Sequence, residues 1–196
     1  DTFGTDAVRW YLMREMPTGA DASYTPERFL ARYDELANVL GNLVSRSTSM
    51  INKYRAGLVP DAASNGLDPE VDHALESARS AIERLKVHDA FAAAMDLARA
   101  ANVYIEERKP WAQAKDPELA TELDETLATL ARVLVVLCAL FQPVATEKMH
   151  ELALRLGLDG VPTLEKAVAE DMTGKRLATG DPLFPRVHPE WMDKTT

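Results

Sequence analysis

The sequence predicts an all-α fold, a bundle of about five helices with a short N-terminal segment and an irregular C-terminal tail. Apolar residues recur every three or four positions along most of the chain, and proline, glycine and threonine stand where such helices should begin or end. Neither an alternating strand pattern nor a fixed-period repeat is found. With 196 residues, of which 46% are hydrophobic, the chain can bury a sizeable core.

The first two predicted helices lie on either side of a turn. Thr5 and Asp6 begin the first helix, and Pro17 interrupts its pattern. Thr25 is the predicted N-cap of the second helix, with Pro26 at the first helical position. We expect this second helix to be the long spine of the domain, because its apolar positions keep one register for about eight turns. These positions are Phe29, Leu30, Tyr33, Leu36, Ala37, Leu40, Leu43, Val44, Met50, Ile51 and Tyr54.

Two further helices follow a loop. Residues 56–68 are rich in Gly, Pro, Asn and Asp and are typical of a loop, and Pro69 opens the next helix. A turn is expected near His88 and Asp89, and Pro110 should end the helix that comes after it. The predicted inward positions of the first helix are Val71, Leu75, Ala78, Ile82 and Leu85, and those of the second are Phe91, Ala94, Leu97, Ala98, Ala101 and Ile105.

The C-terminal part contains the most apolar helix. Residues 118–141 form a long amphipathic pattern that becomes wholly apolar, Pro143 interrupts it, and residues 144–156 form another helix. The longest apolar run, residues 133–141, has nine residues, whereas a bilayer span needs about 20, so we predict no membrane segment. From Gly157 onward the chain is rich in turns.

Cysteine and histidine usage excludes several kinds of site. The single cysteine, Cys138, can build neither a disulfide framework nor a thiolate zinc site, which fits a cytoplasmic protein without a metal cofactor. His73, His88, His150 and His188 show no spacing typical of a catalytic triad, so we expect no catalytic residue in this chain.

The net charge of −9 opposes general phosphate binding. A local patch that stacks and reads unpaired bases can still bind RNA on an acidic protein, which would require an uneven charge distribution. The chain opens with Asp1 and has no charged-then-apolar leader, so we expect an excised fragment or a processed product rather than a secretory precursor.

A polar stripe on the second predicted helix is the first candidate binding surface. Its members lie opposite the apolar face at steps of four, four, three and four residues. Asparagine and arginine present several donors in fixed geometry, which suits base edges and phosphates. An ordinary solvated helix face has the same pattern, and periodicity alone favours that alternative. The stripe consists of Asn38, Asn42, Arg46, Ser49 and Lys53.

Trp111 is the second candidate. It follows Pro110 at the end of a helix and lies near Arg108, Lys109 and Lys115 in the sequence. A tryptophan among cationic side chains can form a stacking platform for an unpaired base. The alternative is a tryptophan that fills the end of the bundle.

Two Glu-x-x-His pairs, Glu70 with His73 and Glu147 with His150, raise a different possibility. Di-iron carboxylate bundles use two such pairs together with glutamates from two other helices. Each pair here lies early in its predicted helix, where a carboxylate faces the helix N-terminus and water. The di-iron bundle therefore remains a remote alternative.

Four segments of the chain resemble, in order, the bacterial methionyl-tRNA synthetases. They are FGTDAVRWYLMREMPTGAD, LANVLGNLVSRSTSMINKY, YIEERKPWAQAKD and LFPR. The resemblance covers essentially the whole chain. It implies the helix bundle that forms the anticodon-binding domain of a class I synthetase, cut away from its catalytic domain. Neither the HIGH nor the KMSKS motif of that family occurs in these residues.

The resemblance also implies a domain organisation and partners. Residues 1–24 would belong to the small stem-contact fold, residues 25–156 would form the anticodon-binding bundle, and residues 157–196 would be a tail that packs back on the bundle or on the catalytic domain. The implied partners are tRNA-Met, through its anticodon loop, and the catalytic domain of the same chain. ATP with magnesium is implied for the parent ligase, and no cofactor is implied for this part.

The family's anticodon-contacting residues match particular positions of this sequence. Asn42 and Arg46 of NLVSR match helix residues that contact the anticodon loop, and Trp111 matches the tryptophan that stacks on it. Pro110 would help to position that ring. Glu106 matches an acidic position that rejects other anticodons, in keeping with a carboxylate that accepts but cannot donate hydrogen bonds. Asn38, Ser49, Lys53, Arg108, Lys109 and Lys115 are further possible RNA contacts.

One alternative from another class of function stays open. A stand-alone, non-catalytic relative of the same bundle could bind tRNA or dock onto another synthetase, because a shared fold does not prove a shared activity. The sequence upstream of Asp1 would distinguish the two. A nucleotide-binding domain that ends in KMSKS would indicate the parent ligase, and an initiation codon would indicate the module.

Overall fold

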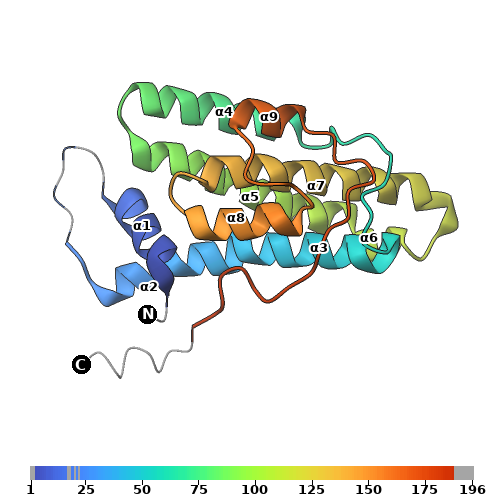
Figure 1. Ribbon diagram of the computed structural model, residues 1–196, viewed down its shortest axis with the longest axis horizontal. Coiled ribbons are helices and arrows are strands. Elements are labelled where there is room, and N and C mark those ends of the chain that lie inside the picture. The colour runs from blue at the N-terminus through green and yellow to red at the C-terminus, as the bar shows by residue number, and fades with distance from the viewer. Residues whose placement is uncertain (1–2, 17–18, 20, 22, 188–196) are drawn as a thin grey trace.

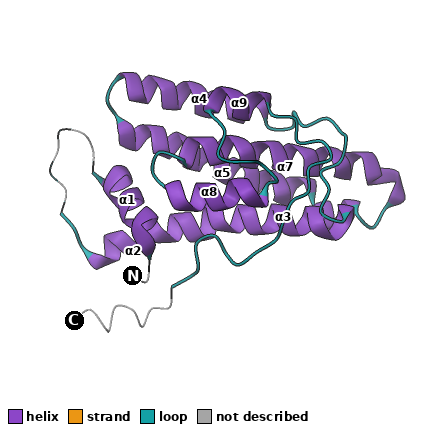
Figure 2. Cartoon of the chain, in the orientation of Figure 1, coloured by secondary structure: helices purple, strands orange, loops and turns teal. Residues whose placement is uncertain are grey.

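The long second helix of the sequence forms the spine of an elongated helical bundle (Figures 1 and 2). The computed structural model describes residues 3–16, 19, 21 and 23–187. Within that part the fold is all-helical, as predicted, apart from an isolated antiparallel bridge between Leu58 and Arg176. The helices are α1 (Gly4–Glu15), α2 (Pro26–Glu35), the π-helical turn η1 (Leu36–Gly41), α3 (Asn42–Arg55), α4 (Asp68–Glu83), α5 (Val87–Arg108), α6 (Pro110–Gln113), the 3-10 turn η2 (Pro117–Leu119), α7 (Ala120–Phe141), α8 (Thr146–Arg155) and α9 (Leu164–Ala169).

The spine helix begins where the sequence predicts, but it contains a π-helical turn that the sequence did not predict. The hydroxyl of Thr25 accepts a hydrogen bond from the N–H of Arg28, which confirms the predicted N-cap. α2 then continues through η1 into α3. At their junction the N–H of Asn42 reaches the carbonyl of Ala37, five residues back instead of four. The hydrogen-bonded loop of η1 therefore contains one residue more than that of the α-helices on either side.

α7 is the central helix of the bundle. It packs against α3, α5, α8 and α9, and its apolar second half is buried on nearly all sides. The alanines of α5 allow that helix to approach closely, and every position of α5 that was predicted to face inward is buried. Trp10 of α1 is fully buried between the rings of Phe91 and Phe141, and its indole N–H donates to the carbonyl of Arg32.

α1 and α8 are joined by reciprocal capping contacts. A carboxylate oxygen of Asp6 accepts a hydrogen bond from the N–H of Lys148 at 2.8 Å, in the first turn of α8. In return, the guanidinium of Arg9 donates to the carbonyls of Pro143 and Val144 between α7 and α8. α1 begins at Gly4, one residue before the predicted start, and Asp6 therefore caps a neighbouring helix instead of its own.

The prediction that Ile82 and Leu85 face inward, at the end of α4, is wrong. Ile82 and Leu85 are 52% and 71% exposed, and Ala81 is buried in place of Ile82. The buried stripe of α4 runs through Val71, Ala74, Ala78 and Ala81, so Ile82 lies beside this stripe and not on it. The turn also comes earlier than expected. Leu85 takes the left-handed conformation with φ 59°, and His88 and Asp89 already belong to α5.

The tail from residue 157 to 187 runs back along the bundle (Figure 1). The N–H of Leu177 donates to the carbonyl of Gly57, and the hydroxyl of Tyr33 donates to the carbonyl of Pro185. Leu183 and Phe184 are buried against the core. The expected turn-rich character holds except for α9, a short helix that the sequence analysis missed. No helix in the described ranges is both long and apolar enough to cross a membrane.

Candidate nucleic-acid interface

Side chains from α3 and α6 meet at an open hollow of about 380 Å³. α3 supplies most of its wall and α6 supplies one tryptophan, so parts of the chain that are far apart in sequence share one surface. Two members of the predicted polar stripe and the predicted stacking residue lie together there. The hollow is lined by Ser45, Arg46, Ser49, Met50, Tyr54 and Trp111.

The turn between α5 and α6 sets the place of Trp111. Lys109 ends α5 in the left-handed conformation with φ 49°, and Pro110 occupies the first turn of α6 and is buried. The buried side chain of Gln113 accepts a hydrogen bond from Thr126 Oγ1, which fixes α6 on α7. The ring of Trp111 is nevertheless 38% exposed. It lines the hollow as a partly open apolar surface, so it is not the core plug considered as an alternative.

Arg46 and Glu106 form an ion pair beside the hollow. Nη2 of Arg46 lies 2.6 Å from Oε1 of Glu106, although the two residues are 60 positions apart in the sequence. The side chain of Glu106 is 61% exposed and that of Arg46 is 29% exposed. An ion pair this open contributes little to stability, about 0 to 1 kcal/mol. The guanidinium keeps further donors that a base or phosphate can use.

Asn42 is held by a residue that the sequence analysis did not identify. Its Nδ2 donates to Oδ1 of Asn102 on α5 at 3.2 Å. Asn102 in turn donates from its own Nδ2 to the carbonyls of Val39 and Ala98. Both asparagines are partly buried. One signal could have identified Asn102, because an asparagine inside an alanine-rich helix lowers helix propensity and suggests another role.

None of the other predicted contact residues lines the hollow itself. Asn38, on η1, is exposed one turn before Asn42, and the π-helical geometry changes the spacing of the stripe at that point. The ammonium of Lys53 lies 5.3 Å from the ring centroid of Tyr54, which lines the hollow. Lys109 and Lys115, on either side of α6, are exposed.

Arg108 is a predicted contact residue that faces α7 instead of the hollow. Its Nε donates to Thr126 Oγ1 at 3.1 Å, and its Nη2 donates to the carbonyl of Glu122. Both partners belong to α7. The guanidinium also lies 6.0 Å from the ring centroid of Tyr104. Arg108 therefore joins α5 to α7, a packing role that its position in the sequence did not indicate.

The two Glu-x-x-His pairs do not form a metal centre. Glu70 and His73 are exposed on α4, and Glu147 and His150 are exposed on α8. A di-iron bundle needs these side chains to point into one interior, so their exposure contradicts that alternative. Within the described ranges, no three histidine, cysteine, aspartate or glutamate side chains converge as metal ligands. His188 lies outside the described residues.

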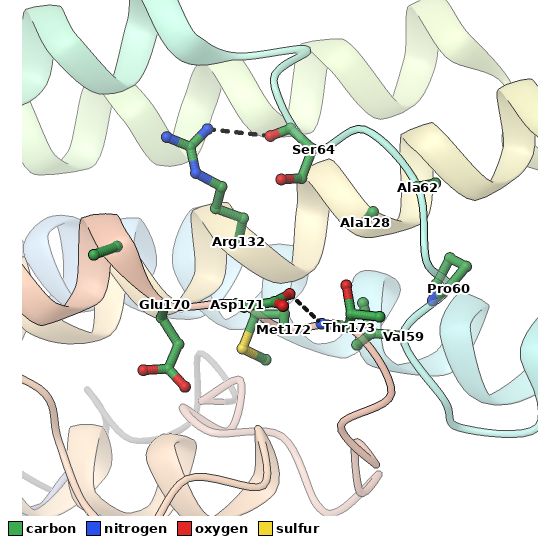
Figure 3. Close-up of a pocket in the computed structure, with 11 residues that line it drawn as sticks. Val59, Pro60, Ala62, Ser64, Ala128, Arg132, Glu170, Asp171, Met172 and Thr173 are labelled. Carbon is green, nitrogen blue, oxygen red and sulfur yellow. Dashed lines mark hydrogen bonds between the residues drawn. The ribbon is translucent and has the colours of Figure 1, made fainter.

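A second hollow has a volume of about 240 Å³ (Figure 3). It is lined by the loop that follows α3, by α7 and by the tail. Arg132 Nη1 donates to the carbonyl of Ser64 and pairs with Asp68. Asp171 accepts a hydrogen bond from the N–H of Thr173. Arg132 thus joins α7 to the loop and to the start of α4, and the Asp171 contact is local to the tail.

The helical bundle has the fold of an anticodon-binding domain. Residues 68–178 match the family model described as the anticodon-binding domain of tRNA ligase, and the chain belongs to this family. Residues 1–48 match the family model described as tRNA synthetases class I (M).

Within this family, the relatives are methionine–tRNA ligases. The chain is 37% identical over 201 residues to the methionine–tRNA ligase of Streptococcus pneumoniae, and 38% identical over 205 residues to that of Listeria monocytogenes. Each match covers 97% of this chain and 30% of the relative, so the chain spans about a third of the length of these proteins.

Solved structures of the same family have the same fold. The apo form of the Mycobacterium tuberculosis methionyl-tRNA synthetase matches with a TM-score of 0.88 at 31% identity, over 96% of this chain and 40% of that one. The same synthetase in complex with methionyl-adenylate matches with a TM-score of 0.86 at 32% identity, over 94% and 38%. The likeness thus extends across almost the whole chain.

Proposed function

We propose that this chain is the anticodon-binding part of a methionine–tRNA ligase and that it recognises the CAU anticodon of tRNA-Met. One observation carries the proposal. Trp111, Arg46 and Ser49 come from two separate helices and share one open hollow. An apolar ring next to a guanidinium and a hydroxyl offers what an unpaired base requires, which is a stacking surface with hydrogen-bonding groups at its edge.

Each residue of the interface has a distinct role in this proposal. Trp111 stacks on an anticodon base, and the buried Pro110 fixes the backbone from which the ring projects. Arg46 and Asn42 supply hydrogen bonds to base edges or phosphate. Glu106 holds Arg46 and repels loops that would place an acceptor or a phosphate against it.

The contacts around the hollow are weaker and less specific. The exposed side chains of Asn38, Ser49, Lys53, Lys109 and Lys115 contact the RNA backbone near the loop. Because Arg108 is already bonded to α7, we assign it a supporting role.

The chemistry of the ligase belongs to a part that these 196 residues do not contain. Without the HIGH and KMSKS motifs, we assign no ATP-dependent step to this chain. ATP and magnesium would bind the catalytic domain, which would attach methionine to the tRNA in the cytoplasm. In this proposal residues 1–24 belong to the stem-contact fold, residues 25–156 form the anticodon-binding bundle, and residues 157–196 form a tail that packs on the bundle or the catalytic domain.

Titration of the chain with anticodon stem-loops tests the proposal. The chain should bind a CAU loop more tightly than loops with one anticodon base changed. Trp111→Ala should weaken CAU binding about five- to 150-fold, the effect of about 1 to 3 kcal/mol of lost stacking. Its melting temperature should fall less far than for a fully buried tryptophan, and binding is compared at a temperature at which both proteins are folded.

Leu164→Ala is the matched control. It removes an apolar side chain with nearly the same exposure, 37%, from α9, which does not line the hollow. This control should bind the CAU loop like the wild type. If Trp111→Ala bound normally and only melted at a lower temperature, the anticodon assignment of this face would be wrong.

A further inference from the structure

The amide of Asn102 has only one chemically sensible orientation. One of its two terminal atoms lies 3.1 Å from the carbonyl oxygen of Val39 and 2.9 Å from that of Ala98. Because both neighbours can only accept hydrogen bonds, the atom that faces them must be Nδ2, which has two N–H donors. Oδ1 of Asn102 therefore faces the other way, toward Asn42.

This orientation determines which end of Asn42 faces the solvent. Oδ1 of Asn102 can only accept, so Asn42 must turn its Nδ2 toward it, and the two atoms lie 3.2 Å apart. In the described part of the chain, no group donates a hydrogen bond to Oδ1 of Asn42. The carbonyl end of the Asn42 amide is thus the end left for a ligand.

Asn102 also fixes the backbone that carries Asn42. The carbonyl of Val39, which accepts from Asn102, lies within η1, and Asn42 is the first residue after that turn. A π-helical turn departs from the regular α-helical hydrogen-bond pattern, and a side-chain donor on its carbonyl helps to hold that geometry. One side chain of α5 therefore holds both the position and the rotation of the Asn42 amide.

We propose that Asn102 is a positioning residue that makes Asn42 present a hydrogen-bond acceptor to the anticodon. This inference rests on the proposed function and specifies the chemistry of the contact. An amide oxygen fixed in this way pairs with a base that offers an exocyclic amine. It rejects a base that offers a carbonyl in the same place, because two acceptors then oppose each other. In a CAU anticodon the cytosine and the adenine each have such an amine.

Two substitutions in the RNA isolate this contact. Replacing the cytosine by uracil, or the adenine by inosine, exchanges the amine for a carbonyl and turns the adjacent ring nitrogen from an acceptor into an N–H donor, with little change of shape. Wild-type chain should prefer the CAU loop over one of these two loops by about tenfold, the effect of about one well-formed hydrogen bond. In Asn102→Ala that same preference should fall to about twofold or less, because the Asn42 amide can then rotate to offer either end.

Asn52→Ala is the matched control for this experiment. Asn52 also donates to the carbonyl four residues before it, that of Thr48, and to a second carbonyl on another element, that of Leu177. Its removal deletes the same two kinds of hydrogen bond without touching Asn42, so it should leave the preference unchanged. Asn102→Ser is the milder variant if the alanine variant does not fold. Serine can still bond the carbonyl of Ala98 but does not reach Asn42, so the preference should again disappear.

The outcomes separate this inference from the proposed function. If wild-type chain does not distinguish the CAU loop from any altered loop, the proposed function fails. If it prefers the CAU loop but is indifferent to both amine-to-carbonyl exchanges, or if either Asn102 variant keeps the full preference, the positioning role is overturned and the function stands.

Discussion

At the scale of single residues, Glu106 and Arg46 show how a charge can select among ligands. Glu106→Gln keeps the shape of the side chain and removes its negative charge. All anticodon loops should then bind about two- to fivefold more tightly at low salt, since an exposed charge contributes at most about 1 kcal/mol. Altered loops should gain more than the CAU loop, because the carboxylate no longer rejects them.

Glu107→Gln is the control for this substitution, because it removes the same charge from the neighbouring exposed position. Binding titrations with the CAU loop and one altered loop measure both variants. An equal gain in the two variants for both loops would indicate that only the overall charge matters. In that case Glu106 would have no selective role.

Cys138 gives a residue-scale prediction about pH. Burial raises the pKa of its thiol to about 12, because the thiolate would lose its hydration inside the core, and Sγ donates to the carbonyl of Met149 at 3.2 Å. The unfolded chain releases this proton near pH 9, whereas the folded chain retains it. The contribution of the buried thiol to the free energy of unfolding is therefore fully present below about pH 9 and is lost as the pH rises toward 12.

Denaturant titrations at several pH values measure this effect. Between pH 8 and pH 10 the free energy of unfolding of the wild type should fall by about 1 kcal/mol more than that of Cys138→Ala. Other groups titrate equally in both proteins, so the difference isolates the thiol. Parallel curves for the two proteins would show that the thiol ionises as easily in the folded chain as in the unfolded chain.

The residues of the interface could be predicted from the sequence only in part. Helical spacing and a tryptophan after a proline made Asn42, Arg46 and Trp111 candidates, but it was the resemblance to the synthetase family that singled them out. The Arg46–Glu106 pair and the Asn42–Asn102 bond depend on how α3 packs on α5, and Arg108 faces α7 for the same kind of reason. Local spacing carries no information about such contacts between helices.

At the scale of helices, the reciprocal contacts of α1 and α8 should contribute measurably to stability. Asp6→Ala would leave the first turn of α8 without its side-chain acceptor and should cost about 1 to 2 kcal/mol. Thr5→Ala, an exposed neighbour in the same turn of α1, should change the stability by less than about 0.5 kcal/mol. Urea denaturation compares the two, and an equal effect would contradict the capping role of Asp6.

Helix starts were easier to predict than helix faces. Thr25 with Pro26, and the proline at position 69, fixed the beginnings of helices through local chemistry, and the apolar period located α5 and α7. The π-helical turn, the short α9 and the exposure of Ile82 and Leu85 were missed. Each of these depends on which neighbour a helix packs against, and α4 packs mainly on α5.

At the scale of the whole molecule, the net charge of −9 limits how the chain can bind RNA. Few cations flank the hollow. For a patch that makes about three phosphate contacts, the logarithm of the binding constant should fall with the logarithm of the salt concentration at a slope of about −2. We expect this shallow slope for the CAU stem-loop between low and moderate salt. A slope steeper than about −5 would indicate a broad basic surface, contrary to a contact dominated by stacking and base reading.

A helix with one extra residue in a single turn tolerates shortening there better than elsewhere. Deleting the exposed Asn38 from η1 should let α2 and α3 join as a continuous α-helix, with the apolar faces on both sides still toward the core. Deleting the exposed Ser49 from α3 instead rotates every later residue of that helix by about 100° and turns Ile51 out of the core. Circular dichroism melting should show a cooperative transition for the first deletion and a much weaker one for the second. The spine would then accept a change of length at one place, next to the residues proposed to read the anticodon.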